Sequence, residues 1–114
     1  DRVLARAVVP WQPPRKWTVH VVQLSHHDVG YTDLASHVLS QHDRWLDATI
    51  DLAAATREYP EAARFRAVIE QTWSVDHYLR HAPPARAAAL VELMRRGDLE
   101  LTALFGNLTT ELCG

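Results

Sequence analysis

The sequence predicts an α/β fold with a small parallel sheet. Three short segments rich in apolar and β-branched residues, 17–24, 64–71 and 99–104, alternate with segments in which apolar residues recur at helical spacing. The connections between these segments contain helices and are long enough to cross over, which favours parallel neighbouring strands. No internal repeat or low-complexity tract interrupts the order. We therefore expect parallel βαβαβ units.

The first strand is expected after an extended lead-in, residues 1–16. Pro10, Pro13 and Pro14 disfavour a regular element in this lead-in. Trp17 to Leu24 is rich in β-branched and aromatic residues, with a nearly continuous apolar centre. Such a run is typical of a parallel strand that is buried on both faces.

A long amphipathic helix and a second strand are predicted next. Apolar residues recur at helical spacing from Leu34 to Ala53, Thr32 can cap the helix, and Pro60 prevents its continuation. Arg64 to Gln71 then has the composition of a shorter strand with polar ends.

Two helices and a third strand complete the predicted order. Trp73 to His81 has the pattern of a short helix. Pro84 suits the start of the next helix and Gly97 suits its end. Leu99 to Leu104 is the third predicted strand.

Composition excludes several classes of partner. The 114 residues carry a formal net charge of -2 with both signs interleaved, which gives no electrostatic footprint for nucleic acid or an anionic membrane. No apolar run is long enough to span a bilayer. The lone Cys113 excludes a disulfide framework and a thiolate zinc site. We expect a soluble protein, with the cytoplasm as its default location.

The ends of the chain suggest part of a larger domain. It begins at Asp1 rather than at a methionine, and it stops at Gly114 directly after a predicted loop. We therefore expect the rest of a catalytic domain as a partner of this segment, and a homo-oligomer is left open.

The run from Ser25 to Tyr31 is the most informative motif. His26 and Asp28 lie two positions apart, so on an extended backbone both side chains point to the same side. An imidazole with a carboxylate suits a divalent metal such as zinc. Two ligands do not complete a metal site, and an alternative stays open in which His27 faces solvent and Asp28 caps the next helix.

Polar and aromatic residues gather at one predicted edge of the sheet. The carboxyl ends of parallel strands meet at one edge, and ligands bind there. The residues at this edge are His26 and Asp28, then Glu70 and Trp73, and finally Gly106, Asn107, Thr110 and Glu111. The opposite edge, with Lys16, Arg64 and Asp98, is expected to hold ordinary solvated turn residues.

Three residues of the polar edge have simpler structural explanations. Glu70 can pair with an arginine, Trp73 can belong to the core, and Glu111 can be an exposed loop carboxylate. These alternatives stay open beside a role in substrate binding.

The segment His26-His27-Asp28-Val29-Gly30-Tyr31 resembles glycoside hydrolase family 38, the retaining α-mannosidases. In the amino-terminal part of that family's catalytic domain, a buried strand ends in a His-x-Asp pair followed by a Gly-aromatic step. Arg64 to Glu70 and Arg96 to Glu111 resemble the next two βα units. The resemblance covers roughly residues 17–114 and implies the first part of a (β/α)7-type barrel.

The resemblance also implies a zinc site for sugar hydroxyls. His26 and Asp28 would be two zinc ligands, and Tyr31 would be the aromatic wall under the sugar. The further substrate-binding candidates at this edge are Glu70, Trp73 and Glu111. No residue of this chain is assigned as nucleophile, acid/base or remaining zinc ligand.

The function implied is a zinc-dependent retaining glycosidase that hydrolyses α-mannosides or related glycans. Val29-Gly30-Tyr31 replaces the family's usual Pro-Gly-Trp and resembles a bacterial branch. We expect the 114 residues alone to be inactive. Two alternatives stay open: a metal-dependent barrel hydrolase of the carbohydrate deacetylase type, and a non-catalytic α/β module that binds a carbohydrate or a partner domain.

Overall fold

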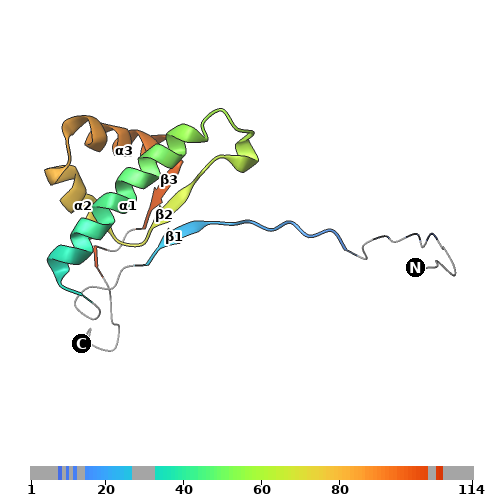
Figure 1. Ribbon diagram of the computed structural model, residues 1–114, viewed down its shortest axis with the longest axis horizontal. Helices are drawn as coiled ribbons and strands as arrows, with labels where there is room; N and C mark the ends of the chain where they lie inside the picture. The colour runs from blue at the N-terminus through green and yellow to red at the C-terminus, as the bar shows by residue number, and fades with distance from the viewer. Residues whose placement is uncertain are drawn as a thin grey trace, which may run out of the picture.

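The structure is a computed structural model that describes residues 8, 10, 12, 15–26, 33–102 and 105–106. The elements are β1 (Gln23–Ser25), α1 (Ala35–Ala55), the 3-10 turn η1 (Glu61–Ala63), β2 (Ala67–Ile69), α2 (Thr72–His81), α3 (Pro84–Arg96) and β3 (Leu99–Leu101). The predicted order of strands and helices is confirmed (Figure 1).

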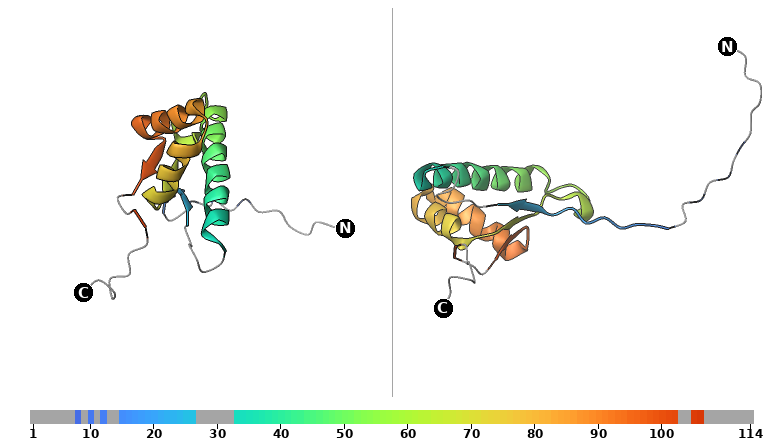
Figure 2. Two further views of the ribbon diagram at one scale, coloured as in Figure 1. Left: turned by 90° about the vertical axis from the view of Figure 1, so that its left-hand side faces the viewer. Right: turned by 90° about the horizontal axis from the view of Figure 1, so that it is seen from below.

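The strands form a parallel sheet in the order β1-β2-β3. Leu24, Val68 and Glu100 lie side by side in register. The helices lie together on one side of this sheet, and α1 packs against both α2 and α3 (Figures 1 and 2). Helices on one side of a parallel sheet in sequential strand order imply that both βαβ crossovers have the same sense, and such crossovers are right-handed in nearly all proteins.

The core lies between the sheet and the helices. Ala67, Ile69 and Leu99 alternate with more exposed strand residues, so they mark the face of the sheet that the helices cover. The remaining buried apolar residues of the core are Leu46, Ile50 and Ala53 of α1, Val75 and Tyr78 of α2, and Leu90 and Leu93 of α3. On the opposite face of the sheet, Val68 is half-buried and Glu100 is exposed.

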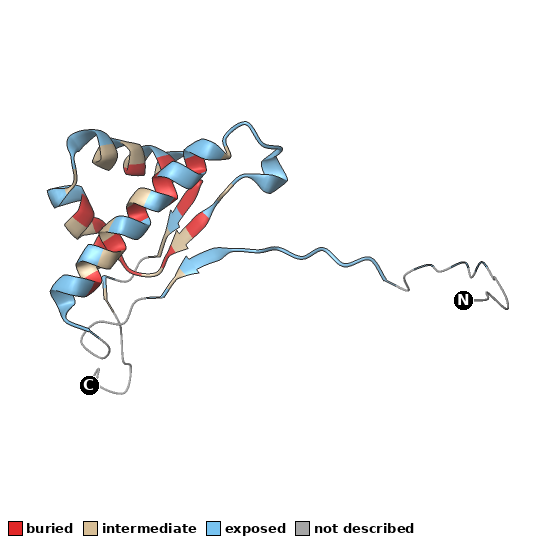
Figure 3. Ribbon diagram, viewed as in Figure 1, coloured by how far each residue is buried: buried red, intermediate tan, exposed pale blue. Residues whose placement is uncertain are grey.

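The first strand differs from its prediction in both length and burial. β1 has 3 residues, and the extended chain before it leaves the body, as the blue segment of Figure 1 shows. Val19 is 79% exposed and Leu24 is 58% exposed, so the predicted burial on both faces is wrong here (Figure 3). Burial on both faces needs a layer on each side, and the described residues supply helices on one side of the sheet.

The helix ends are mostly where the sequence predicts them. α2 begins one residue earlier than expected, and α3 runs from Pro84 to the residue before Gly97, whose φ of 73° is the left-handed conformation that favours glycine. α1 has Leu34 at its N-cap, without a side-chain cap, so the predicted capping position is wrong; Thr32 lies outside the described residues. None of the described helices has the length and apolarity to cross a bilayer.

Candidate functional site

His26 and Glu70 are brought into contact at the carboxyl edge of the sheet. Ser25 pairs with Ile69 in the parallel register, so the residues that follow these two are neighbours. The Nδ1 atom of His26 lies 3.1 Å from Oε2 of Glu70. The His26 side chain is 70% exposed and that of Glu70 is 34% exposed. The structure thus joins the first two strand ends through an imidazole and a carboxylate.

The backbone around Glu70 is tied to the end of β3. The Thr102 hydroxyl donates a hydrogen bond to the Glu70 carbonyl oxygen. The Thr102 N–H donates to the Ile69 carbonyl oxygen over 3.1 Å. These bonds extend the parallel pairing by a step past β2 and β3, so they fix the backbone that carries the Glu70 side chain.

Trp73 stands at the same edge, in the first turn of α2. Its backbone N–H donates to the Phe105 carbonyl oxygen over 3.0 Å, which links the start of α2 to the segment that follows β3. Its side chain is half-buried. The structure therefore brings Trp73, Glu70 and the third strand end together, as the edge rule predicts.

Three of the predicted site residues, Asp28, Tyr31 and Glu111, lie outside the described residues. Within residues 15–26, 33–102 and 105–106, no group of three or more His, Cys, Asp or Glu side chains is placed to hold a metal. Gly106 is half-buried at the predicted edge. The assignment of Asp28 as a zinc ligand, and of Tyr31 and Glu111 as sugar contacts, stays a prediction.

The two described side chains at this edge, an imidazole and a carboxylate, are donor types that zinc accepts, and they do not by themselves form a complete ligand set. Zinc binds imidazole nitrogen and carboxylate oxygen. A ligating histidine usually donates its other ring N–H to a carboxylate, a backbone carbonyl or water. The contact between Nδ1 of His26 and the Glu70 carboxylate has this form.

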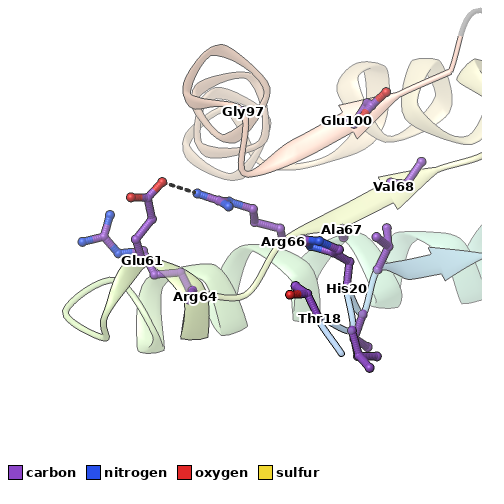
Figure 4. Close-up of a pocket in the computed structure, with 13 residues that line it drawn as sticks. Thr18, His20, Glu61, Arg64, Arg66, Ala67, Val68, Gly97 and Glu100 are labelled. Carbon is purple, nitrogen blue, oxygen red and sulfur yellow. Dashed lines mark hydrogen bonds and ion pairs between the residues drawn. The ribbon is translucent and has the colours of Figure 1, made fainter. Parts of the chain in front are cut away.

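The opposite edge of the sheet holds a hollow of about 720 Å³ with a mixed lining of valines and charged side chains (Figure 4). Arg66 donates to Glu61 over 3.3 Å, and Nε of Arg64 donates to the Tyr59 carbonyl oxygen over 3.0 Å. The hollow is lined by two arginines and two glutamates, so its charges largely balance. The four side chains, Glu61, Arg64, Arg66 and Glu100, are exposed. Exposure of Arg64 agrees with the sequence prediction for this edge.

Asp98 differs from the prediction of a solvated turn residue. Its side chain is 11% exposed and forms an ion pair with Nη2 of Arg96. The Asp98 N–H donates to the Leu93 carbonyl oxygen in the turn around Gly97, and this turn carries the aspartate inward toward the start of β3. The prediction is wrong because a tight helix stop places the next residue against the body.

A charged network joins the three helices away from the strand ends. Asp47 accepts hydrogen bonds from the Tyr78 hydroxyl and from Nε of Arg86, at 2.5 and 2.7 Å. Nη1 of Arg86 also donates to Asp51 over 2.7 Å, and Nη2 donates to the Asp47 carbonyl oxygen. Asp47 and Asp51 are one turn apart on α1, so one guanidinium from α3 reaches both.

The hydrogen bonds and charges of this network lower the pKa of Asp47 and raise those of Tyr78 and Arg86. The Tyr78 hydroxyl, and then Arg86, lower the pKa of Asp47 because they stabilise its charged form. Burial, followed by the Asp47 carboxylate, raises the pKa of Tyr78 to about 12. Asp51 and Asp47 raise the pKa of Arg86, which therefore stays charged. The network is a structural clamp between helices, and the spacing of Asp47 and Asp51 was its signal in the sequence.

A second histidine–carboxylate pair also lies in the helix layer. Nδ1 of His77 is 3.2 Å from Oδ1 of Asp43, and the two side chains are 27% and 33% exposed. The His77 ring stacks on the His81 ring, with centroids 4.3 Å apart. This pair joins α1 to α2.

Comparison with known proteins defines the class to which this fold and edge belong. Residues 16–105 match the family model described as the N-terminal domain of glycosyl hydrolases family 38. The chain therefore belongs to family 38 of the glycoside hydrolases. No curated protein and no solved structure matches the chain.

Proposed function

We propose that this chain supplies the first strands and part of the metal site of a zinc-dependent retaining glycosidase, which hydrolyses α-mannosides or related glycans. The observation that carries the proposal is the contact between His26 and Glu70 at the carboxyl edge of a parallel sheet. Family membership supports glycosidase chemistry, and the donor types at this edge support zinc.

In this proposal, His26 and Asp28 would hold the zinc ion, which would supply Lewis-acid chemistry to hydroxyls of the sugar. Tyr31 forms the aromatic wall under the sugar, while Trp73 and Glu111 line the pocket. A retaining mechanism needs two carboxyl groups roughly 5–5.5 Å apart across the scissile bond. We assign neither of these carboxyl groups to this chain.

We also infer that the sheet is the first part of a (β/α)7-type barrel. All three strands are parallel and follow one another in space as in the sequence. The helices lie on one face, and the other face presents Leu24, Val68 and Glu100. A barrel has this arrangement, with helices outside and alternate strand residues inside.

The test uses the intact catalytic domain that carries this chain, with an aryl α-mannoside as substrate. We expect turnover that requires zinc and releases a sugar of retained anomeric configuration, as measured by NMR of the first product. Release of the inverted anomer would contradict the mechanism, and release of acetate from an acetylated sugar would favour the deacetylase alternative. The 114-residue chain by itself should show no turnover with zinc.

A further inference from the structure

We propose that Glu70 is a positioning residue that orients His26 and presents its Nε2 atom to the metal. This inference rests on the proposed zinc site and gives Glu70 a different role from that of a sugar contact. The observation behind it is the 3.1 Å contact between Nδ1 of His26 and Oε2 of Glu70.

The contact selects one tautomer of the histidine ring. An ionised carboxylate only accepts hydrogen bonds, so the ring nitrogen that faces Glu70 is the one that carries the proton. In the neutral ring, the other nitrogen then holds the lone pair that binds a metal. Nδ1 faces Glu70, which makes Nε2 of His26 the ligating atom.

The burial of the two side chains explains why the ring needs this partner. The His26 side chain is 70% exposed, so burial alone does not set the angle of its ring. The Glu70 side chain is 34% exposed and stands on a backbone that Thr102 holds through two hydrogen bonds. The carboxylate thus projects from a fixed stretch of backbone, and we infer that it positions the more exposed imidazole.

The Glu70 carboxylate also adds charge to the site. A carboxylate that accepts from the ring N–H makes the opposite nitrogen a better donor to a cation. Removing such a partner lowers metal affinity by roughly 10–100-fold. A residue that contacts only the sugar would instead raise KM and leave metal affinity unchanged.

The experiment measures the affinity of the intact, metal-stripped domain for Zn²⁺ by competition with a chromogenic chelator. The variants are Glu70→Ala, Glu70→Gln, and the matched control Asp43→Ala, which breaks the 3.2 Å contact to His77 in the helix layer. We expect Glu70→Ala to weaken zinc binding about 10- to 100-fold. Glu70→Gln, whose amide oxygen still accepts from Nδ1–H, should lose less, and Asp43→Ala should bind zinc like the wild type.

Kinetics at saturating zinc separate the positioning role from substrate contact. If both Glu70 variants bind zinc like the wild type, or if KM rises while zinc affinity is unchanged, the inference fails and the zinc site stands. If the wild-type domain itself binds no zinc, the proposed function fails and the inference fails with it. Where the Ala variant does not fold, Glu70→Met decides the matter, because its side chain has a similar size and no oxygen to accept from Nδ1–H. Wild-type zinc affinity in Glu70→Met would overturn the inference.

Discussion

The two histidine–carboxylate pairs described above have nearly the same geometry and different surroundings. His26 and Glu70 lie 3.1 Å apart at the ends of two strands, whereas His77 and Asp43 lie 3.2 Å apart between two helices. The His26 side chain is 70% exposed and the His77 side chain is 27% exposed. The first pair reaches outward from the carboxyl edge of the sheet, and the second is packed into the helix layer.

Because the two distances are nearly equal, the proposed difference in role rests on where each pair lies and on how exposed its histidine is. Beside the His77 pair, the helices also carry the clamp of Asp47, Tyr78 and Arg86. Helix-layer contacts should therefore affect stability, and the edge pair should affect metal binding. Variants in the two regions test this division when each is measured for both properties.

The largest expected effect on stability comes from the core. Leu46 is 1% exposed at the centre of the cluster shared by α1, the sheet and the other helices. Leu46→Ala should lower the free energy of unfolding by about 2–5 kcal/mol because it leaves a cavity. Urea unfolding of the intact domain measures this loss, and zinc affinity of the folded fraction should not change. A fall in zinc affinity would break the proposed division.

Arg86 provides the next largest effect. Arg86→Ala removes the hydrogen bonds to two carboxylates and leaves Asp47 and Asp51 near each other on α1. We expect a loss of about 1.5–3 kcal/mol in the free energy of unfolding, as for a hydrogen bond to a charged group. Arg86→Lys keeps the charge without the forked geometry and should recover part of it. Equal stability of Arg86→Ala and the wild type would show that the clamp contributes nothing.

Tyr78 makes the stability of the clamp depend on pH. The pKa of Tyr78 in the folded protein is about 12, above the ordinary 10.0. The contribution of protonated Tyr78 to the free energy of unfolding is therefore fully present below pH 10 and is lost as the pH rises through 12. The pKa of Asp47 is lowered, so its contribution is present above the ordinary 3.8 and is lost as the pH falls through the folded value. The stability difference between the wild type and Tyr78→Phe should therefore shrink at both extremes, as measured by chemical unfolding. A constant difference would contradict the assigned hydrogen bond.

The smallest expected effect comes from the second histidine pair itself. Asp43→Ala removes a partly exposed contact, for which about 0.2–1 kcal/mol in the free energy of unfolding is typical. Thermal and urea unfolding of the intact domain measure the change. A loss of zinc affinity in this variant would show that the helix-layer pair reaches the site and would remove the contrast between the two pairs.

The sequence predicted the order of the elements better than their lengths. Pro84 and Gly97 bracket α3 because each backbone restriction is local and does not depend on distant residues. The burial of β1 was predicted wrongly. An apolar run shows that a strand is suited to burial on both faces, but it does not show whether the same chain provides the helices or strands that would cover those faces. Asp98 was predicted to be solvated but is largely buried. Its burial depends on the tertiary position of the turn at Gly97 and on the ion pair with Arg96, neither of which the local sequence shows.

At the candidate site, the edge rule correctly brought His26 and Glu70 to the same end of the sheet. The direct contact between them could not be predicted, because it depends on the register of Ser25 with Ile69. A slip of one residue from this register would turn one of the two side chains to the other face of the sheet and separate the pair. The roles of Asp28, Tyr31 and Glu111 still rest on the sequence pattern.

Zinc content tests the central claim that the carboxyl edge of this sheet is part of a metal site. The intact domain, purified in zinc and desalted, is analysed by elemental analysis as wild type, His26→Ala and the matched control His77→Ala. We predict stoichiometric zinc in the wild type and in His77→Ala, and its loss in His26→Ala. Absence of zinc from the wild type, or equal zinc in His26→Ala, would contradict the account.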